Sequence, residues 1–400
     1  MQTSKNKKVL ITFARSFNAL ELCRHFHSAG YRVFTADSID QHVSKYSNAV
    51  EKNFKIPSPR FDSKNYINGL IEIIEKEQIR LLVPVYEEIA RISKESHRFP
   101  SSCEIFAPSF ELYHELQNKW LFQQKLHSLG FKTLKCQLIR TVDDVKTLDF
   151  TVPFAIKPCF SRTSQKVQRV TPKNSGAIHI EIDSFNPWIA QEWATGKKFC
   201  TYSVCRQGKI FAHSVYPVNY AIGGNSCVSF QAVEHLPILE WITKFVGAIN
   251  YTGQIAFDFI EIENGELMAI ECNPRVTSGV LLFKDKDRLN EAFLGTNRQM
   301  IQPELKTRRQ IAMGMLLYGW RKQAKANNTL KRFLKDFFTT KDVIFRIKDP
   351  APFFLKPLVF VNIWMKSRKL GLNIPNYFTH DHDWNGELLS HNLKTEDRTN

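Results

Sequence analysis

The chain has 400 residues, of which 43% are apolar, and this content is enough for buried cores and excludes a disordered chain. At about 150 residues per domain, the length predicts two or three domains. The net charge of +16 predicts an anionic partner, which could be a nucleotide, a polyanionic substrate, nucleic acid or an anionic membrane surface. Residues 301–400 hold 18 Lys and Arg against 9 Asp and Glu, so more than half of the excess charge lies there.

The eight cysteines show neither a CxxC pair nor the Cys/His spacing of a zinc finger, which argues against structural zinc and against a disulfide framework. We therefore expect reduced thiols in a cytoplasmic protein. The basic start of the chain is followed by an apolar run that ends at Arg15, too short for a signal peptide. Because no stretch of about 18 uncharged apolar residues occurs, we expect no membrane-spanning helix.

The first segments alternate between strand and helix patterns. Apolar runs predict strands at Val9–Phe13 and Tyr31–Ala36, and the amphipathic stretch Ala19–Ser28 between them predicts a helix. This is a β-α-β opening of Rossmann type. It lacks GxGxxG, so we do not expect a dinucleotide at the first turn.

A helix at 61–78 and strands at 80–85 and 103–107 complete a predicted first domain, residues 1–108. Glu87 follows the strand at 80–85, at the carboxyl end where ligands of open α/β sheets bind. It is a candidate ligand contact, with a helix N-terminal role as the alternative.

Two lysines stand out in the next stretch. Ser109–Gly130 is predicted to be one helix, and it carries Lys119. Lys157 ends the apolar run that begins at Phe154, so it is partly desolvated and an anionic partner would compensate it. The polar turn 161–164, with the guanidinium of Arg162, could hold phosphate oxygens or be an ordinary hairpin loop.

The strand predicted at Trp188–Glu192 runs out into Trp193 and Ala194. A strand that leaves its sheet in this way frees backbone N–H and C=O groups that can bind an adenine edge. Further strands are predicted at Thr201–Cys205 and Lys209–Val215, before a loop at 223–225 and a helix at 238–249.

The most informative stretch is the hairpin predicted around Asn264-Gly265. A symmetric turn there places Asp258 directly across from Glu271, with Asn273 on the same face. Facing carboxylates repel, so we expect a hard divalent cation between them, most plausibly magnesium carried in with a nucleotide. The alternative is an edge hairpin with solvated acids. The same register places Leu267 and Ala269 on the carboxylate face, and Ile270 on the opposite one.

Taken together, residues 9–295 resemble the ATP-grasp superfamily. They look most like its carbamoyl-phosphate-synthase-like and carboxylate–amine ligase branches. The matching residues are Asn118-Lys119, Ile156-Lys157-Pro158, Gln191-Glu192-Trp193-Ala194 followed by Gly196, Asp258, and Ile270-Glu271-Cys272-Asn273-Pro274-Arg275.

The resemblance implies a Rossmann-like N-terminal domain (1–108), a two-lobed ATP-grasp domain (109–300) and a basic, mainly helical C-terminal extension (301–400). It also implies ATP and Mg²⁺ as cofactors, with Mn²⁺ as an alternative metal. The implied roles are phosphate contacts for Lys119 and Lys157, adenine binding for Gln191, Glu192, Trp193 and Ala194, metal ligation for Asp258, Glu271 and Asn273, and catalysis by Arg275 at the transferring phosphoryl group.

Two features depart from the family pattern. Lys198 occupies the position where the family usually has a glutamate for the ribose hydroxyls, so we expect Lys198 near the nucleotide but leave ribose contact open. The phosphate-covering loop of the family is commonly rich in glycine, whereas residues 161–166 contain none.

The resemblance implies an ATP-dependent ligase that activates a carboxylate as an acyl phosphate for attack by an amine. The alternatives are a small-molecule kinase and a nucleotide-binding module without turnover. Candidate contacts to the carboxylate and amine substrates are Glu87, Arg162, Tyr220 and Gly224. We expect no nucleic-acid partner, because no groove-binding helix or stacked-aromatic motif appears, and we leave homodimerisation open.

In the last quarter, Thr307–Lys325 is predicted to be helical. Phe353–Leu370 combines aromatic bulk with a basic end. This segment fits either a helical cap packed on the ligase or an interfacial segment that contacts an anionic membrane.

Overall fold

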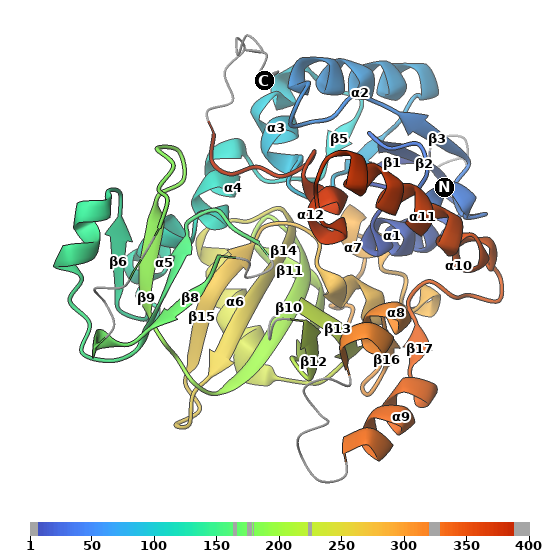
Figure 1. The fold of residues 1–400 in the computed structure, drawn as a ribbon. Coiled ribbons are helices and arrows are strands. Elements are labelled where there is room, and N and C mark those ends of the chain that lie inside the picture. Colours follow the sequence, from blue (N-terminus) through green and yellow to red (C-terminus); the bar gives the residue numbers. More distant parts are fainter. Residues whose placement is uncertain are drawn as a thin grey trace.

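A computed structural model of the chain describes residues 7–162, 166–173, 178, 180–222, 226–319 and 329–387 (Figure 1). In these ranges four β-sheets are surrounded by helices, which agrees with the predicted α/β class. Figure 1 shows the first sheet at the upper right, two antiparallel sheets at the left and centre, and a small sheet at the lower right.

The first sheet is parallel, with strand order β3-β2-β1-β4-β5. Its strands are β1 (Lys8–Thr12), β2 (Arg32–Asp37), β3 (Lys52–Lys55), β4 (Leu81–Val83) and β5 (Glu104–Ile105), and its helices are α1 (Phe17–Ser28), η2 (Val43–Tyr46), α2 (Ser63–Glu77), α3 (Ile89–Lys94) and η3 (Ser96–Arg98). Both faces are covered, as parallel sheets require. Val9 and Ile11 pack with the core on the α1 side, whereas Leu10 packs with the core on the α2 side. The predicted β-α-β opening is therefore present.

The predicted helix Ser109–Gly130 is in fact two helices, α4 (Phe110–Gln117) and α5 (Lys119–Ser128). The break occurs at Asn118, whose side-chain oxygen accepts hydrogen bonds from Trp120 N (3.0 Å) and Leu121 N (3.1 Å). This is an N-cap, and it starts a new helix because the capping residue itself adopts extended backbone angles. The break places Lys119 at the first position of α5.

Two four-stranded antiparallel sheets follow, with orders β6-β9-β7-β8 and β11-β10-β14-β15. Their elements are β6 (Cys136–Ile139), η4 (Val142–Thr147), β7 (Phe154–Pro158), β8 (Gln168–Val170), β9 (Trp188–Glu192), β10 (Lys197–Arg206), β11 (Lys209–Pro217), α6 (Leu236–Ala248), β14 (Gly253–Glu261) and β15 (Leu267–Asn273). Phe122 of α5 and Phe245 of α6 pack against Phe257 of β14, so these two helices cover one face of the second sheet.

The small sheet has the order β12-β13-β16-β17 and joins strands from both sides of residue 300. The elements around it are β12 (Tyr220–Ile222), β13 (Ser226–Gln231), η6 (Ser278–Leu282), η7 (Asp285–Asp287), α7 (Asn290–Leu294), β16 (Arg308–Gln310), α8 (Ala312–Gly314), η8 (Met315–Gly319), α9 (Thr329–Thr339) and β17 (Lys341–Asp342). The helix predicted from Thr307 is therefore wrong at its start, where β16 pairs with β13, and residues 320–325 lie outside the described ranges. The small sheet therefore crosses residue 300, where the sequence predicted a domain boundary.

Three C-terminal helices, α10 (Ala351–Phe354), α11 (Lys356–Lys369) and α12 (Ile374–Thr379), lie over the first sheet on the side of α1 (Figure 1). Val359, Ile363 and Tyr377 belong to the same buried core as Val9 and Ile11 of β1. The end of the chain thus returns to its beginning. None of the helices in the described ranges combines the length and the apolar character needed to cross a bilayer.

Candidate functional site

A cavity of about 550 Å³ is lined by residues of both larger antiparallel sheets, of the loop between β1 and α1, and of α12. Small-molecule sites fall in the range of about 300–1,000 Å³. The cavity gathers the residues predicted to bind nucleotide and metal, together with one of the predicted substrate contacts. They are Lys119, Lys157, Arg162, Gln191, Glu192, Trp193, Ala194, Lys198, Asp258, Glu271, Asn273 and Arg275. Their roles stay predictions, but their convergence is a property of the fold.

The carboxylate pair lies on the hairpin formed by β14 and β15, and Asp258 faces Glu271 across it, as predicted. The turn differs from the symmetric one that we expected. A backbone hydrogen bond of 3.0 Å from Ile262 N to Glu266 O closes a three-residue loop. Gly265, at φ 82°, occupies the left-handed position that such a loop requires. This turn alone would shift the pairing by one residue.

A β-bulge restores the register. Phe259 pairs with Ala269 and Asp258 pairs with Glu271, which leaves Ile270 as the extra residue. The bulge also corrects the predicted faces, because it exchanges the sides of the residues between it and the turn. Ala269 and Leu267 pack with Phe259 in the core rather than beside the carboxylates, and Ile270 lines the cavity.

The surroundings of the two carboxylates differ in charge. Burial raises the pKa of Asp258, and the facing Glu271 carboxylate raises it further. Burial also opposes the ionisation of Glu271, but Lys119 and Lys157 outweigh it and hold the pKa of Glu271 below its ordinary value. The pair therefore holds negative charge that the protein only partly neutralises, and a divalent cation would favour full ionisation of both groups.

Two lysines approach the pair from different elements. Lys119, at the start of α5, donates from Nζ to Ser161 O (2.8 Å) and lies 3.5 Å from Glu271 Oε2. Lys157, in β7, is only 5% exposed, and burial lowers its pKa to about 8 even though Glu271 acts in the opposite direction. A buried lysine beside a cavity is stabilised by an anionic ligand, since such a ligand replaces the lost hydration.

The stretch Gln191–Ala194 lines the cavity at the end of β9, as expected for an adenine-binding connector. The backbone contacts differ from those we predicted. Glu192 N donates to Lys135 O and Trp193 N to Pro153 O, both at 2.9 Å, so these two N–H groups are already used. Within the described ranges the side-chain Nε2 of Gln191 is buried without a hydrogen-bond partner. This side chain therefore has a donor that a ligand in the cavity could use.

Gly196 follows the connector, and its φ of 159° lies in the region that favours glycine. A Cβ atom placed there would lie 2.1 Å from Glu261 O of β14. Only glycine allows the chain to pass this close to the second sheet, so Gly196 fixes how the connector enters β10.

Arg275 follows β15 and also lines the cavity. Its Nη2 donates to Asn273 Oδ1 (2.9 Å), and its guanidinium lies 5.1 Å from the centre of the Tyr86 ring. Its Nε is buried and has no hydrogen-bond partner among the described residues. Part of the donor fork thus stays available for a phosphate or carboxylate oxygen.

The geometry can be compared with known proteins. No family model matches the sequence, and no curated protein matches it. The chain is similar to N5-carboxyaminoimidazole synthetase from Staphylococcus aureus complexed with ADP, at 13% identity and a TM-score of 0.61, over 76% of this chain and 80% of that one.

It is also similar to L-amino acid ligase from Bacillus licheniformis (16% identity, TM-score 0.57, 74% of this chain and 78% of that one). A third match is biotin carboxylase from Campylobacter jejuni (13%, TM-score 0.59, 77% and 75%). This chain has the ATP-grasp fold. At these identities the likeness shows the fold alone, so the roles of individual residues must be argued from their geometry.

The residues that this ATP-grasp fold brings together fit the predicted metal ion. Among the described residues no group of three His, Cys, Asp or Glu side chains could hold a metal, and the candidate set here combines two carboxylates with the amide of Asn273. All three supply oxygen, the ligand atom that Mg²⁺ and Mn²⁺ prefer. Burial and the facing Glu271 carboxylate raise the pKa of Asp258, so a cation bound beside it would favour its ionised form.

Two of the four predicted substrate contacts do not reach the cavity. Glu87 is fully buried and accepts hydrogen bonds from Arg162, from Gln117 Nε2 (3.1 Å) and from Trp384 N (2.8 Å). Its carboxylate is thus occupied by the protein itself. Arg162 does line the cavity, but it is also held by Glu87 and by Asp383 Oδ2 (3.1 Å).

Tyr220 lies in a separate small core with Phe333, where its hydroxyl donates to Asp336 Oδ2 (2.8 Å). It does not line the cavity, whereas Cys227 of the neighbouring strand β13 does. Gly224, the fourth candidate, lies outside the described residues.

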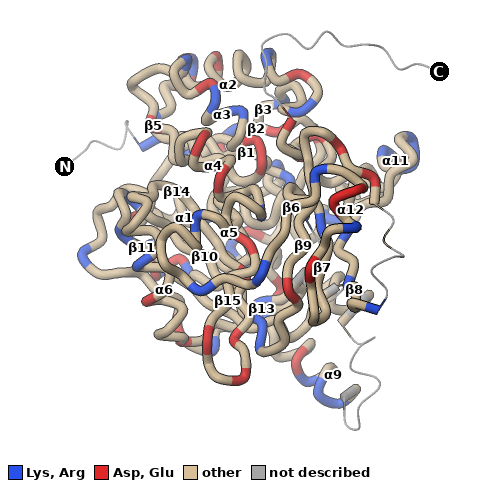
Figure 2. The backbone as a smooth tube through the Cα atoms, turned by 90° about the vertical axis from the view of Figure 1, so that its left-hand side faces the viewer, with Lys and Arg blue, Asp and Glu red and all other residues tan. Residues whose placement is uncertain are grey.

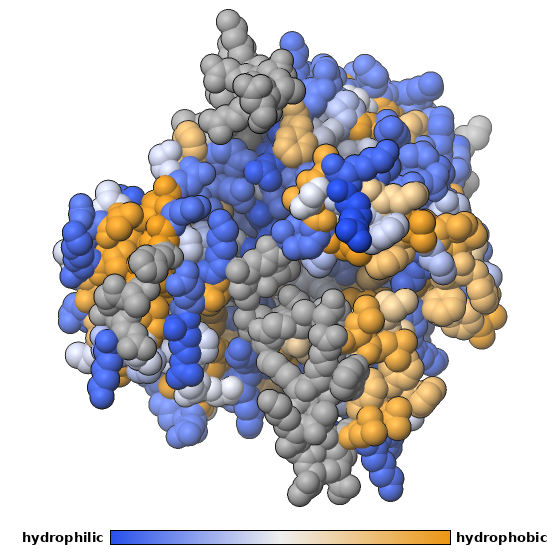
Figure 3. Space-filling view, in the orientation of Figure 1, coloured by the Kyte–Doolittle hydropathy of each residue, from blue (hydrophilic) through white to orange (hydrophobic). Residues whose placement is uncertain are grey.

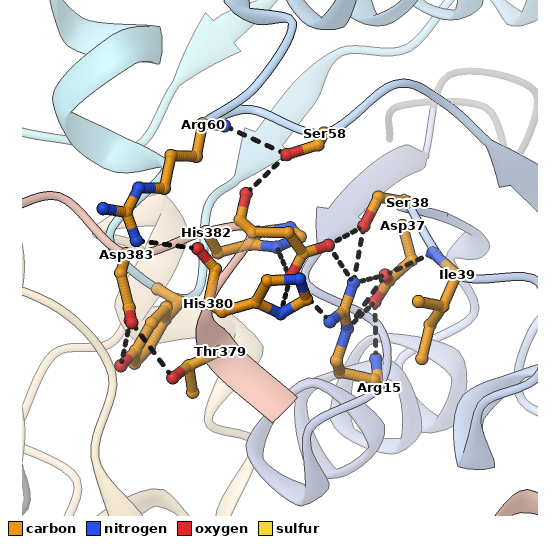
Figure 4. Close-up of polar contacts among 12 residues, drawn as sticks. Arg15, Asp37, Ser38, Ile39, Ser58, Arg60, Thr379, His380, His382 and Asp383 are labelled. Carbon is orange, nitrogen blue, oxygen red and sulfur yellow. Dashed lines mark hydrogen bonds and ion pairs between the residues drawn. The ribbon is translucent and has the colours of Figure 1, made fainter. Parts of the chain in front are cut away.

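Sequence reasoning missed the contribution of the chain's end. Phe378 and Thr379 of α12 line the cavity, and residues 380–383 continue into a buried polar network (Figure 4). At its centre Arg15 bridges Asp37 of β2 and Asp381, with Nη1 donating to Asp381 Oδ1 at 2.9 Å. The signal that could have indicated this site is the dense run of acidic, histidine and tryptophan residues at 380–384.

Proposed function

We propose that the protein is an ATP-dependent ligase that activates a carboxylate as an acyl phosphate and joins it to an amine. The observation that carries the proposal is the convergence of Lys119 and Lys157 with the facing pair Asp258 and Glu271 on one cavity. Proteins named as a synthetase and a ligase share the fold, and one of them is complexed with ADP, which supports the proposal.

The nucleotide would lie between the two larger antiparallel sheets. The connector that ends with Ala194 would hold the base, while Lys119 and Lys157 would neutralise phosphate oxygens. Asp258, Glu271 and Asn273 would hold Mg²⁺, which when bound neutralises charge on the transferring phosphoryl group.

Arg275 then lies where the two substrates meet. Its free donors would reduce the repulsion between the incoming carboxylate and the γ-phosphate. A carboxylate oxygen attacks the γ-phosphorus, the bond from that phosphorus to the β–γ bridging oxygen breaks, and ADP leaves. The amine nitrogen then attacks the acyl carbon, expels phosphate and loses its proton to it. No protein nucleophile is needed.

The part of the cavity beyond Arg275 has aromatic walls. Phe13 stacks on Tyr86 with ring centres 4.6 Å apart and meets Phe378 edge-on at 5.8 Å, and all three line the cavity. Such walls favour an organic acid with an apolar or aromatic body over a small polar one.

The test is ADP release across a panel of carboxylates, each with and without amines, followed by mass spectrometry of the products. Asp258→Asn should lower turnover at least about 100-fold, because metal-assisted charge stabilisation contributes several kcal/mol to such barriers. Glu263→Gln is the matched control, since Glu263 is an exposed acid at the tip of the same hairpin. It should leave turnover unchanged.

The products separate the alternatives. ADP, phosphate and an amide support the ligase, whereas ADP with a phosphorylated substrate indicates a kinase. Bound but unchanged ATP with every carboxylate and amine pair indicates a nucleotide-binding module. Turnover of Asp258→Asn equal to that of the wild type would contradict the assignment of the metal site.

A further inference from the structure

The outer surface of α10 and α11 is apolar although nothing in the described residues covers it. Phe354, Leu358, Val361 and Met365 are 67, 63, 49 and 46% exposed. At about 100° per residue, the spacing of three and four places Leu358, Val361 and Met365 in one stripe along α11, and Phe354, the last residue of α10, precedes this stripe in the chain. We call this stripe, together with Trp364 beside it, the outer face.

The exposure is not a sign of a loosely attached helix. Val359 and Ile363, on the opposite side of α11, are 5 and 6% exposed and pack into the core that contains β1 and α1. The helix is therefore anchored on one side and apolar on both sides. A helix that only capped the protein would carry polar residues on its solvent side. The outer face is apolar instead, which indicates that it binds a partner.

The exposed apolar residues of the protein are concentrated in this region. Of the 22 large apolar side chains recorded as exposed among the described residues, 15 lie between Met313 and Leu370. Figure 3 shows residues of high hydropathy gathered over α10 and continuing toward α9. Scattered exposed apolar residues are normal, but a continuous surface of this kind marks an interaction site.

The charged residues of the segment that carries the outer face have one sign, although Asp342, from outside this segment, interacts with Lys356. Residues 350–380 contain no Asp or Glu, and their Lys and Arg are Lys356, Lys366, Arg368 and Lys369. Figure 2 shows blue along α11 and no red. Three of the four cations lie in the last turn of the helix, and Arg368 lies over the Trp364 ring at 5.5 Å. The surface is thus complementary to a partner that has negative charges at its surface and an apolar layer below them.

A second copy of the chain fits this face poorly. Because residues 350–380 supply no acid, pairing two outer faces would bring only cations together around the apolar stripe. An anionic lipid surface satisfies both requirements, since its headgroups pair with the lysines and its acyl region accepts the apolar side chains.

We propose that the outer face of α10 and α11 docks the protein on an anionic bilayer, with the helix axis in the plane of the membrane. The docking is peripheral. Its length is that of one helix of 14 residues, or about 21 Å at about 1.5 Å per residue.

The docked orientation would bring the substrate cavity near the lipid. α11 is followed directly by α12, whose Phe378 and Thr379 line that cavity. An acid or amine presented at a membrane would then have a short path to the site. Docking itself, however, does not depend on the enzymatic proposal and is tested without turnover.

The experiment is co-sedimentation of the full chain with vesicles of phosphatidylcholine alone or mixed with phosphatidylglycerol, at low and physiological salt. We expect binding to the anionic vesicles, at least about tenfold weaker binding to the neutral ones, and weakening as salt increases. Leu358→Asp combined with Met365→Asp should abolish binding. Phe61→Asp, a residue 61% exposed outside this surface, is the matched control and should bind as the wild type does.

Each other outcome overturns the proposal. Absence of binding to either vesicle removes it, and equal binding to neutral and anionic vesicles removes the anionic lipid as the partner. Wild-type binding by the Leu358→Asp, Met365→Asp variant would assign the binding to another surface. Light scattering completes the test: a dimer that this double variant converts to a monomer would show that the face joins two copies instead.

Discussion

The buried bridge at Arg15 gives the sharpest prediction about stability. Arg15 is 1% exposed and pairs with Asp37, which is fully buried, and with Asp381, which is 6% exposed (Figure 4). Arg15→Met keeps much of the side-chain volume but removes the guanidinium from both buried carboxylates, of which Asp381 keeps His382 Nδ1 at 3.2 Å. Removing one partner of a buried ion pair costs about 3–5 kcal/mol.

This loss should fall on the attachment of the C-terminal segment. Asp381 belongs to a stretch whose amides are held locally, with His382 N and Asp383 N donating to Thr379 O at 2.8 and 2.9 Å. If the whole destabilisation falls on the release of that stretch, the equilibrium constant for its local opening rises by a factor of about 100 to several thousand, because about 1.4 kcal/mol corresponds to a tenfold change. Hydrogen–deuterium exchange of peptides covering residues 374–387 measures this factor directly.

The control is Arg32→Met, because Arg32 pairs with Glu51 on the same sheet but both side chains are about half exposed, at 48 and 40%. An exposed pair contributes about 0–1 kcal/mol, so exchange should change less than about fivefold. Equal protection of residues 374–387 in Arg15→Met and in the wild type would refute the reasoning.

The effect should also depend on pH. In the wild type burial opposes the ionisation of Asp37, but Arg15 outweighs it and holds the pKa of Asp37 low, so the pair stabilises the protein at neutral pH and is lost on acidification. Without Arg15, burial instead raises this pKa above its unfolded value of about 3.9. Protonation of Asp37 then removes the unpaired buried charge from the variant. The loss of stability in Arg15→Met relative to the wild type should therefore become smaller between pH 7 and 5.

Two further predictions concern other residues. Phe378→Ala should raise KM for the carboxylate about tenfold or more and leave KM for ATP unchanged, because burial of an aromatic side chain contributes about 1.5–3 kcal/mol. Steady-state kinetics with each substrate varied in turn would measure both constants. An equal rise in KM for ATP would contradict the proposal that the aromatic walls contact the carboxylate substrate. Burial lowers the pKa of His213 to about 4, so the unfolded state binds the extra proton between about pH 6.5 and 4 and stability falls as pH falls through that window. From pH 6.5 to 5 the loss in the free energy of unfolding is about 1.6 kcal/mol. Urea denaturation should show this loss in the wild type and a flatter profile in His213→Gln, and parallel profiles would assign the slope to other groups.

The sequence predicted the pairing of Asp258 with Glu271 correctly, but from a symmetric turn that the structure does not have. Asp258 faces Glu271 because a three-residue turn and the bulge at Ile270 shift the register in opposite directions. Alternating apolar residues reveal a strand, but they do not reveal where an extra residue is inserted. The pairing was therefore predictable and the faces near the turn were not.

Whether the other elements could be predicted depended on how strongly the local sequence determines each of them. The strand Trp188–Glu192 was predicted to the residue, since an apolar run marks it. The break at Asn118 was missed, because an asparagine inside a helical pattern signals a cap only when its side chain turns back onto the following amides. Arg308–Gln310 is a strand only because β13 lies beside it, so no local pattern could identify it.

The contribution of the chain's end was beyond local patterns altogether. Arg15 and Asp381 are 366 residues apart, and Glu87 and Trp384 are 297 apart. A charged residue in an irregular segment predicts solvent exposure unless its partner is known. In this protein both partners are buried, and only the fold brings them together.

The return of the C-terminus to the first sheet has a practical consequence for dissecting this protein. A fragment ending near residue 300, the predicted end of the ATP-grasp domain, would lose three features. They are the Phe378 wall of the cavity, the Asp381 partner of Arg15, and strand β16 beside β13. During synthesis the same dependence means that the finished site forms only after residue 384 has left the ribosome. A truncation anywhere between residues 300 and 384 is therefore expected to remove part of the cavity or of the network that supports it.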